Sequence, residues 1–96
     1  MGLRARWLRA ARANLEAAAE YVSQDSPTSA ERLVLRILEA INQLKTHPAM
    51  GRPGRVPGTR ELVVPGTPNI VPYCIRGGNI EIIRVLHAAR RWPGKF

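Results

Sequence analysis

Residues 26–44 read SPTSAERLVLRILEAINQL, and this stretch decides the fold of the chain. Its apolar side chains recur every three or four positions, which is the spacing of one face of an α-helix. These side chains are Ala30, Leu33, Val34, Ile37, Leu38, Ile41 and Leu44. Ser26 is a good N-cap, and Pro27 suits the first helical position, where its missing N–H costs nothing. The stretch therefore predicts a long helix, which Pro48 ends.

The residues before this stretch predict another helix and a short strand. From about Leu8 to Val22, apolar residues, many of them alanine, follow the same helical spacing. Because only about three or four residues join the two helical stretches, we expect an antiparallel αα-hairpin. Residues 3–7 form a brief run, LRARW, that we interpret as a first strand.

The C-terminal half predicts strands. Runs rich in Ile and Val cover residues 61–64, 70–75 and 80–86. Gly77-Gly78-Asn79 is a tight-hairpin signal between the last two runs. Pro72 cannot donate a hydrogen bond to a neighbouring strand, so we expect a bulge or a locally broken pairing beside it.

The predicted fold class is α+β with the order β-αα-βββ, in which a helical hairpin packs on a small antiparallel sheet. Residues 1–96 are expected to form a single domain, because a chain of 96 residues has room for one core. The last run is apolar on both faces, as expected for a central strand. Residues 51–59, GRPGRVPGT, are expected to form a basic loop, which either only connects its neighbours or contacts an anionic partner directly. They are no phosphate-binding P-loop, because the closing Gly-Lys-Ser/Thr is missing.

The composition excludes several classes of protein. Apolar residues make up 45% and charged residues 23% of the chain, which is typical of a globular protein. No apolar run approaches the ~20 residues that span a bilayer, so we expect no membrane partner. The single cysteine, Cys74, excludes an intrachain disulfide, and together with His47 and His87 it shows no metal-ligand spacing. We therefore expect a cytoplasmic protein without a metal or a cofactor.

The charge of the chain is unusually positive. Fifteen Lys and Arg stand against seven Asp and Glu, which gives a net charge of +8. Residues 51–96 contribute +6 and residues 1–15 contribute +4, whereas residues 16–50 contribute −2. Thirteen of the basic residues are Arg, whose guanidinium matches carboxylate and phosphate groups. The charge therefore favours an anionic partner, such as a nucleic acid or an acidic protein.

The end of the last strand contains the candidate functional side chains. His87 has the chemistry of an acid or base beside a phosphate, or it simply caps the strand. Arg84 lies on the opposite face from His87 in a regular strand, and only a twist or a bulge would bring the two together. Trp92 either stacks on a partner or packs back over the sheet edge. Glu61 lies next to Arg60, which predicts a local ion pair.

Several motifs cover nearly the whole chain and are specific as an ordered set. They are a Trp-bearing first strand, Ala11-x-x-Asn14-Leu15, Glu20-Tyr21-Val22, Asp25-Ser26-Pro27 with Ala30, His47-Pro48-Ala49-Met50-Gly51-Arg52, Thr59-Arg60-Glu61-Leu62-Val63, Tyr73-Cys74-Ile75 and Ile83-Arg84-Val85-Leu86-His87-Ala88-Ala89-Arg90-Arg91-Trp92-Pro93. With these motifs the chain resembles the RelE/ParE superfamily of bacterial toxins from type II toxin–antitoxin modules. The resemblance implies a small basic toxin that is neutralised by an antitoxin, whose C-terminal segment wraps across it.

Two activities occur in this superfamily. RelE-like members cut messenger RNA in the ribosomal A site, and ParE-like members poison DNA gyrase. If the chain is a ribonuclease, the resemblance implies a catalytic site without a metal, formed by Arg60, Arg84, His87 and Arg90. His87 would then be the proton donor or base, and the arginines would stabilise the charge on the phosphate.

Other residues favour the ParE-like branch. Asn69 and Ile70 stand where many ribonuclease members place a Tyr-Arg pair, and no Tyr follows His87. We therefore expect a growth inhibitor that acts on DNA gyrase and is neutralised by a cognate antitoxin. Its target-binding residues would be those of the basic tail, Arg90, Arg91, Trp92 and Lys95.

Two alternatives stay open from the sequence. One is a ribosome-dependent mRNA endonuclease, whose partners are the ribosome and mRNA. The other is a non-toxic basic module that binds nucleic acid. The sequence does not identify the residues that bind the antitoxin.

Overall fold

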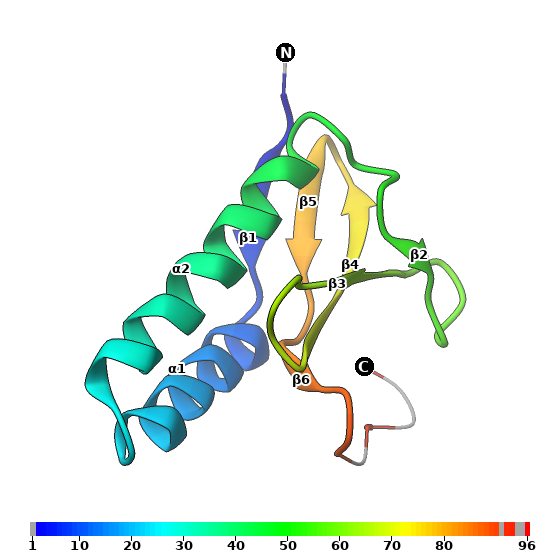
Figure 1. Cartoon of the computed structure of the whole chain (residues 1–96). Coiled ribbons are helices and arrows are strands. Elements are labelled where there is room, and N and C mark those ends of the chain that lie inside the picture. Colours follow the sequence, from blue (N-terminus) through cyan, green and yellow to red (C-terminus); the bar gives the residue numbers. More distant parts are fainter. Residues whose placement is uncertain (1, 91, 94–95) are drawn as a thin grey trace.

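The structure is a computed structural model, and it describes residues 2–90, 92–93 and 96. A pair of helices packs against a sheet (Figure 1), so the predicted α+β class is confirmed. The elements in chain order are β1 (Arg4–Trp7), α1 (Arg9–Ser23), α2 (Pro27–Leu44), β2 (Arg52–Pro53), β3 (Arg60–Val63), β4 (Asn69–Arg76), β5 (Asn79–Ile82) and β6 (Leu86–His87).

The helical hairpin forms as predicted. α2 begins directly after Ser26, whose side-chain oxygen accepts a hydrogen bond of 3.2 Å from the N–H of Ser29. Pro27 occupies the first turn of the helix. Only residues 24–26 separate α1 from α2, so the two helices lie side by side (Figure 1). Ala11 of α1 is fully buried, and its small side chain allows a close approach of the neighbouring elements.

The sheet is mixed, and not purely antiparallel as predicted. The strand order is β1-β5-β4-β3-β2, and β6 also pairs with β4. β4 is antiparallel to β3 and β5, and the turn before β5 has φ angles of 58° at Gly77 and 76° at Gly78, which suit a two-residue hairpin. β1 runs parallel to β5. A tight turn sets an antiparallel direction, whereas β1 is connected to β5 only through both helices and the intervening strands.

The last predicted strand is broken into β5 and β6. β4 pairs with both strands, but the register differs by one residue between the two: Tyr73 lies opposite Ile82 of β5, and Ile70 lies opposite Leu86 of β6. Residues 83–85 therefore lie opposite residues 71–72, three against two, which is the arrangement of a β-bulge. The N–H of Ile83 donates a hydrogen bond of 2.9 Å to the carbonyl of Pro72, but Pro72 has no N–H to donate in return. The predicted disturbance beside Pro72 is confirmed.

A short strand interrupts the predicted connecting loop of residues 51–59. β2 pairs with β3, so that Arg52 lies opposite Glu61. Beyond it, the N–H of Gly54 donates a hydrogen bond of 2.8 Å to the carbonyl of Thr59, which closes the turn. The prediction of a loop is wrong at β2, because pairing with β3 satisfies the backbone there.

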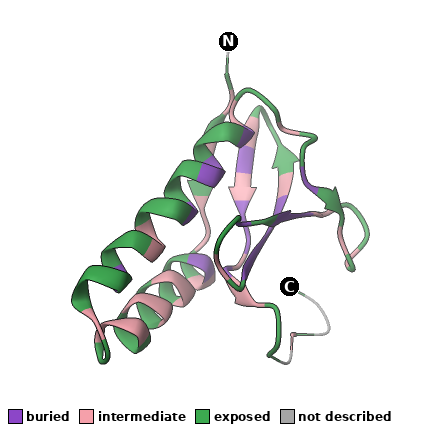
Figure 2. Cartoon of the chain, viewed as in Figure 1, coloured by how far each residue is buried: buried purple, intermediate pink, exposed green. Residues whose placement is uncertain are grey.

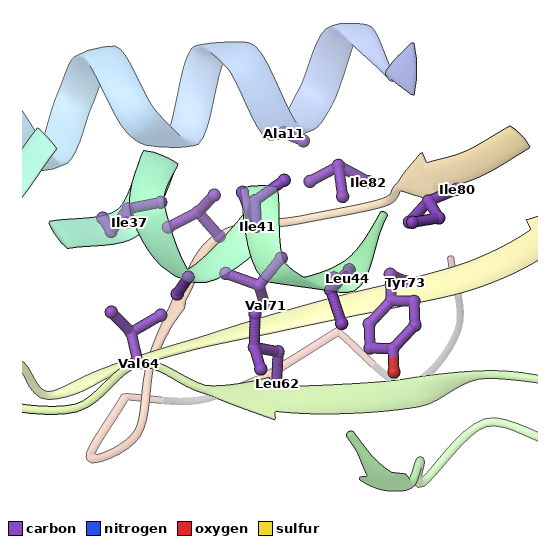
Figure 3. Packing of buried hydrophobic residues seen from close by; sticks show 12 residues of the cluster. Ala11, Ile37, Ile41, Leu44, Leu62, Val64, Val71, Tyr73, Ile80 and Ile82 are labelled. Atoms are coloured by element: carbon purple, nitrogen blue, oxygen red, sulfur yellow. The ribbon is translucent and has the colours of Figure 1, made fainter. Parts of the chain in front are cut away.

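The core lies between α2 and the sheet (Figures 2 and 3). Its fully buried large side chains include Ile37 and Leu44 of α2, Val71 and Tyr73 of β4, and Ile80 and Ile82 of β5. The Tyr73 hydroxyl donates a hydrogen bond of 2.7 Å to the carbonyl of Pro48 and accepts one of 3.0 Å from the N–H of Gly51. The chain that leaves α2 is therefore fixed to the central strand.

Candidate functional site

A groove of about 760 Å³ lies between the helical hairpin and β6. The hairpin end of the two helices extends beyond the sheet (Figure 1). Leu33 of α2 and Val85 line the groove, and both also belong to or pack on the core. Other lining side chains come from α1, from the turn before β4 and from the C-terminal segment that includes Trp92. The groove thus joins elements from both ends of the chain.

The groove is positively charged. Arg32, Arg36 and Arg90 line it, and among the described residues no Asp or Glu does. Arg36 donates a hydrogen bond of 3.1 Å to the carbonyl of Gly66, and the Arg90 guanidinium lies 5.4 Å from the centre of the Tyr21 ring. With an apolar floor and arginines around it, the groove fits a ligand that is both apolar and acidic.

His87 lies at the wall of this groove. It pairs with Asn69 in the β4–β6 ladder. Its ring Nδ1 accepts a hydrogen bond of 3.1 Å from the N–H of Ala89. In the neutral ring the hydrogen is then on Nε2, which makes that atom a donor.

The structure places Arg60 and Arg84 away from the groove. Arg60 donates hydrogen bonds of 2.7 Å and 3.3 Å to the carbonyls of Gly51 and Ala49. The Arg84 guanidinium lies 5.4 Å from the centre of the Phe96 ring. Neither side chain lines the groove that contains His87. The bulge that the sequence allowed for is present, yet of the four residues of the ribonuclease hypothesis only two, His87 and Arg90, line the groove.

Glu61 forms the most buried ion pair among the described residues, and its partner is not the one that the sequence predicts. Its side chain is 4% exposed, and it pairs with Arg52 at 3.1 Å. It also accepts a hydrogen bond of 2.9 Å from the N–H of Arg55. The predicted ion pair with Arg60 is not found, because neighbouring residues of a strand point to opposite faces. One signal in the sequence could have indicated this role: Glu61 is the only acidic residue between positions 51 and 80, among several arginines.

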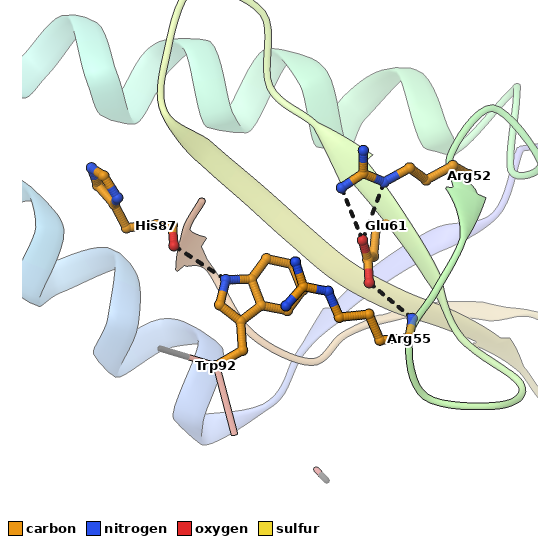
Figure 4. Close-up of polar contacts among 5 residues, drawn as sticks. All are labelled: Arg52, Arg55, Glu61, His87 and Trp92. Atoms are coloured by element: carbon orange, nitrogen blue, oxygen red, sulfur yellow. Dashed lines mark hydrogen bonds and ion pairs between the residues drawn. The ribbon is translucent and has the colours of Figure 1, made fainter. Parts of the chain in front are cut away.

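Trp92 packs back on the protein, as one of its two alternatives predicted. Its indole N–H donates a hydrogen bond of 3.2 Å to the carbonyl of His87. The guanidinium of Arg55 lies 3.8 Å from the centre of the ring (Figure 4). Sequence reasoning missed Arg55, since no local pattern connects a loop residue to the tail. Arg91 and Lys95, the other predicted residues of the tail, lie outside the described residues.

Cys74 lacks the environment of a reactive thiol. Burial, followed by the nearby Glu81 carboxylate, raises the pKa of its thiol above the ordinary value. The Sγ atom lies 3.7 Å from an oxygen of Glu81. A raised pKa lowers the share of thiolate, which is the reactive form of cysteine.

The described part of the chain contains no group of three or more His, Cys, Asp or Glu residues that would hold a metal ion. Within the same residues, no helix is long and apolar enough to cross a membrane.

Comparison with known proteins finds a matching family model, related sequences and a similar solved structure. The family model described as "ParE toxin of type II toxin-antitoxin system, parDE" matches residues 5–92. The chain is 43% identical to a Sinorhizobium fredii protein named toxin Y4kP, over 94% of this chain and 93% of the relative. It is 36% identical to toxin RelE2 of Caulobacter vibrioides, over 88% of this chain and 93% of the relative. A solved structure of the chromosomal ParDE system from P. aeruginosa superposes with a TM-score of 0.80 at 32% identity, covering 88% of this chain and 95% of the other.

Proposed function

The chain belongs to the ParE toxin family of type II toxin–antitoxin systems, and on this premise we propose that it inhibits growth by binding DNA gyrase in the cytoplasm. Its partner in the module is a cognate antitoxin. The relatives have names of both the ParE and the RelE type, so the choice of target depends on the geometry of this chain.

The observation that supports a binding toxin is the separation of the four residues that a ribonuclease would use. General acid–base catalysis requires its groups within about 3 Å of the reacting atoms. Stabilisation of a phosphate in the transition state requires cations aimed at the same point. Here Arg60 bonds to backbone carbonyls and Arg84 lies beside Phe96, while His87 and Arg90 line the groove. A protein that only binds its target has no such requirement.

The experiment compares gyrase with messenger RNA as the target. Purified toxin is added to a DNA supercoiling assay with gyrase, and in parallel to a translating extract in which transcript cleavage is measured. We expect inhibition of gyrase without cleavage. The variant His87→Ala should keep this inhibition, whereas Arg90→Glu and truncation after His87 should abolish it. A circular dichroism spectrum and a thermal unfolding curve check that each variant is folded.

The opposite result would overturn the proposal. If transcripts are cut and His87→Ala lowers the rate by orders of magnitude, the chain is a ribosome-dependent endonuclease. If both assays show no effect while the protein binds DNA or RNA, the non-toxic binding module is the better description.

We also propose that the groove beside β6 binds the antitoxin. The support is chemical: Arg32, Arg36 and Arg90 surround an apolar floor, and no carboxylate lines the groove. An acidic, amphipathic segment fits such a surface.

A further inference from the structure

The loop between β2 and β3 contacts the C-terminal segment through Arg55 and Trp92 (Figure 4). We propose that Arg55 is a positioning residue, which holds Trp92 in the place from which Trp92 contributes to target binding. The inference rests on the proposed role of the basic tail. It adds a residue that lies 35 positions before Arg90 in the chain.

The backbone of Arg55 is fixed by a hydrogen bond to the sheet. Its N–H donates a hydrogen bond of 2.9 Å to the Glu61 carboxylate, which belongs to β3. Glu61 is 4% exposed and also pairs with Arg52 of β2. Because the carboxylate is anchored in two strands, it holds the backbone of Arg55 in place before any partner arrives. A preorganised group loses less conformational freedom when it makes a contact.

Trp92 is held on two sides. The indole N–H bonds to the carbonyl of His87 at 3.2 Å, which fixes one edge of the ring. The Arg55 guanidinium lies 3.8 Å from the ring centre, well within the roughly 6 Å over which a cation attracts an aromatic face. In the described part of the chain after Arg90, Trp92 is the residue whose side chain makes a hydrogen bond to the body of the protein.

The position of the Trp92 ring decides the shape of one wall of the groove, because Trp92 and Arg90 both line it. Without Arg55, the ring would keep a single hydrogen bond to β6. The Trp92 ring would then sample other positions, and target binding would fall because fewer molecules present the bound conformation.

The test measures the exposure of Trp92 directly. The chain has two tryptophans, so Trp7→Phe leaves Trp92 as the one fluorescent indole. Acrylamide quenching is compared among this parent, Arg55→Ala, Arg55→Lys and Arg12→Ala. Arg12 is the matched control, because it is exposed on α1 and its side chain has no partner among the described residues. Growth arrest after induction in a bacterial host is measured for the same four proteins, since it reports toxicity whatever the target is.

We expect Arg55→Ala to raise the quenching constant of Trp92 and to weaken growth arrest roughly two- to five-fold, the population change that corresponds to one exposed cation–π contact. Arg55→Lys keeps the charge but loses the planar group, so its quenching constant and its growth arrest should lie between those of the parent and of Arg55→Ala. Arg12→Ala should match the parent.

The proposal would be overturned by unchanged quenching in Arg55→Ala. It would also be overturned by increased quenching with full growth arrest, since Arg55 would then hold the ring without positioning it for the target. A parent that arrests growth but leaves gyrase active would contradict the proposed target alone, and the comparison between Arg55 and Arg12 would still decide the role of Arg55.

Discussion

The side-chain oxygen of Asn14 in α1 accepts a hydrogen bond of 3.2 Å from the N–H of Val85 in the bulge between β5 and β6. Val85 is 5% exposed, so water cannot easily replace this acceptor. The bulge removes Val85 from the ladder with β4, and Asn14 supplies the partner that the ladder no longer offers. Helix α1 thereby fixes the part of the sheet that leads into the groove.

Asn14→Ala should lower the free energy of unfolding by about 1–3 kcal/mol, because it leaves a buried N–H without an acceptor. Chemical denaturation measures this change. Asn42→Ala is the control, since Asn42 is exposed on α2 and alanine raises helix propensity there as it does at Asn14. Asn14→Asp keeps an acceptor and should restore part of the loss. Equal stabilities for the Asn14→Ala and Asn42→Ala variants would contradict the role of the hydrogen bond.

The buried phenol of Tyr73 should make the folded protein less stable at high pH. Burial raises the pKa of its phenol above the ordinary value of 10.0, although the N–H of Gly51 and the charge of Arg60 oppose this shift. The folded state therefore holds the neutral phenol more strongly than the unfolded state does. This contribution is fully present below pH 10.0 and is lost as the pH rises through the folded pKa.

The measurement is the free energy of unfolding between neutral pH and about pH 11.5. Cys74→Ser serves as the background, because the pKa of the Cys74 thiol is also raised and the thiol would titrate in the same range. Tyr73→Phe should cost about 1–3 kcal/mol at neutral pH, where two hydrogen bonds are lost, and the difference should narrow above pH 10. Tyr21→Phe, which removes a phenol from a ring that is 62% exposed, is the matched control. If the difference in unfolding free energy between the parent and Tyr73→Phe stays constant as the pH rises, ionisation of Tyr73 does not govern stability at high pH.

Gly51 is fitted closely against the same phenol. A Cβ atom at this position would lie 2.6 Å from both Cε1 and the hydroxyl of Tyr73. Gly51→Ala should therefore cost about 1–3 kcal/mol of unfolding free energy through overpacking. In the Tyr73→Phe background the hydroxyl is absent, so the same change should cost less, with a coupling of at least about 0.5 kcal/mol. Additive effects in this double-mutant cycle would show that the Tyr73 hydroxyl does not limit the space at Gly51.

The helices could be predicted from the sequence because their signals are local. The apolar spacing of residues 27–44, the cap at Ser26 and the stop near Pro48 each act on residues only a few positions away in the chain. The parallel direction of β1 and the split of the last strand depend instead on how distant segments meet. Pro72 did give a local warning of the second feature, because proline cannot complete a ladder.

For the candidate site too, the sequence predicts the local features but not the contacts between distant residues. The place of His87 at a strand end and the size of Trp92 beside basic residues are local signals, and both are visible in the sequence. The partners that hold these side chains come from residues far apart in the chain, such as Arg55 for Trp92. The sequence predicts an ion pair between Glu61 and its neighbour Arg60, whereas strand pairing brings Glu61 to Arg52. Tertiary pairing of this kind has no local pattern.

The positive groove predicts that the rate of antitoxin binding depends on salt. Arg32 is exposed at the groove and its side chain has no partner among the described residues, so its charge is available to attract an acidic segment. Arg32→Ala should lower the association rate constant roughly two- to ten-fold at low salt, and the difference should vanish near 1 M salt, where charges are screened beyond about 3 Å. Arg12→Ala removes the same charge from a helix position outside the groove and should have a smaller effect. Stopped-flow mixing with the cognate antitoxin measures these rates. If both variants slow association equally, the attraction comes from the net charge and not from the groove, and rates that are insensitive to salt would mean that apolar contacts govern the encounter.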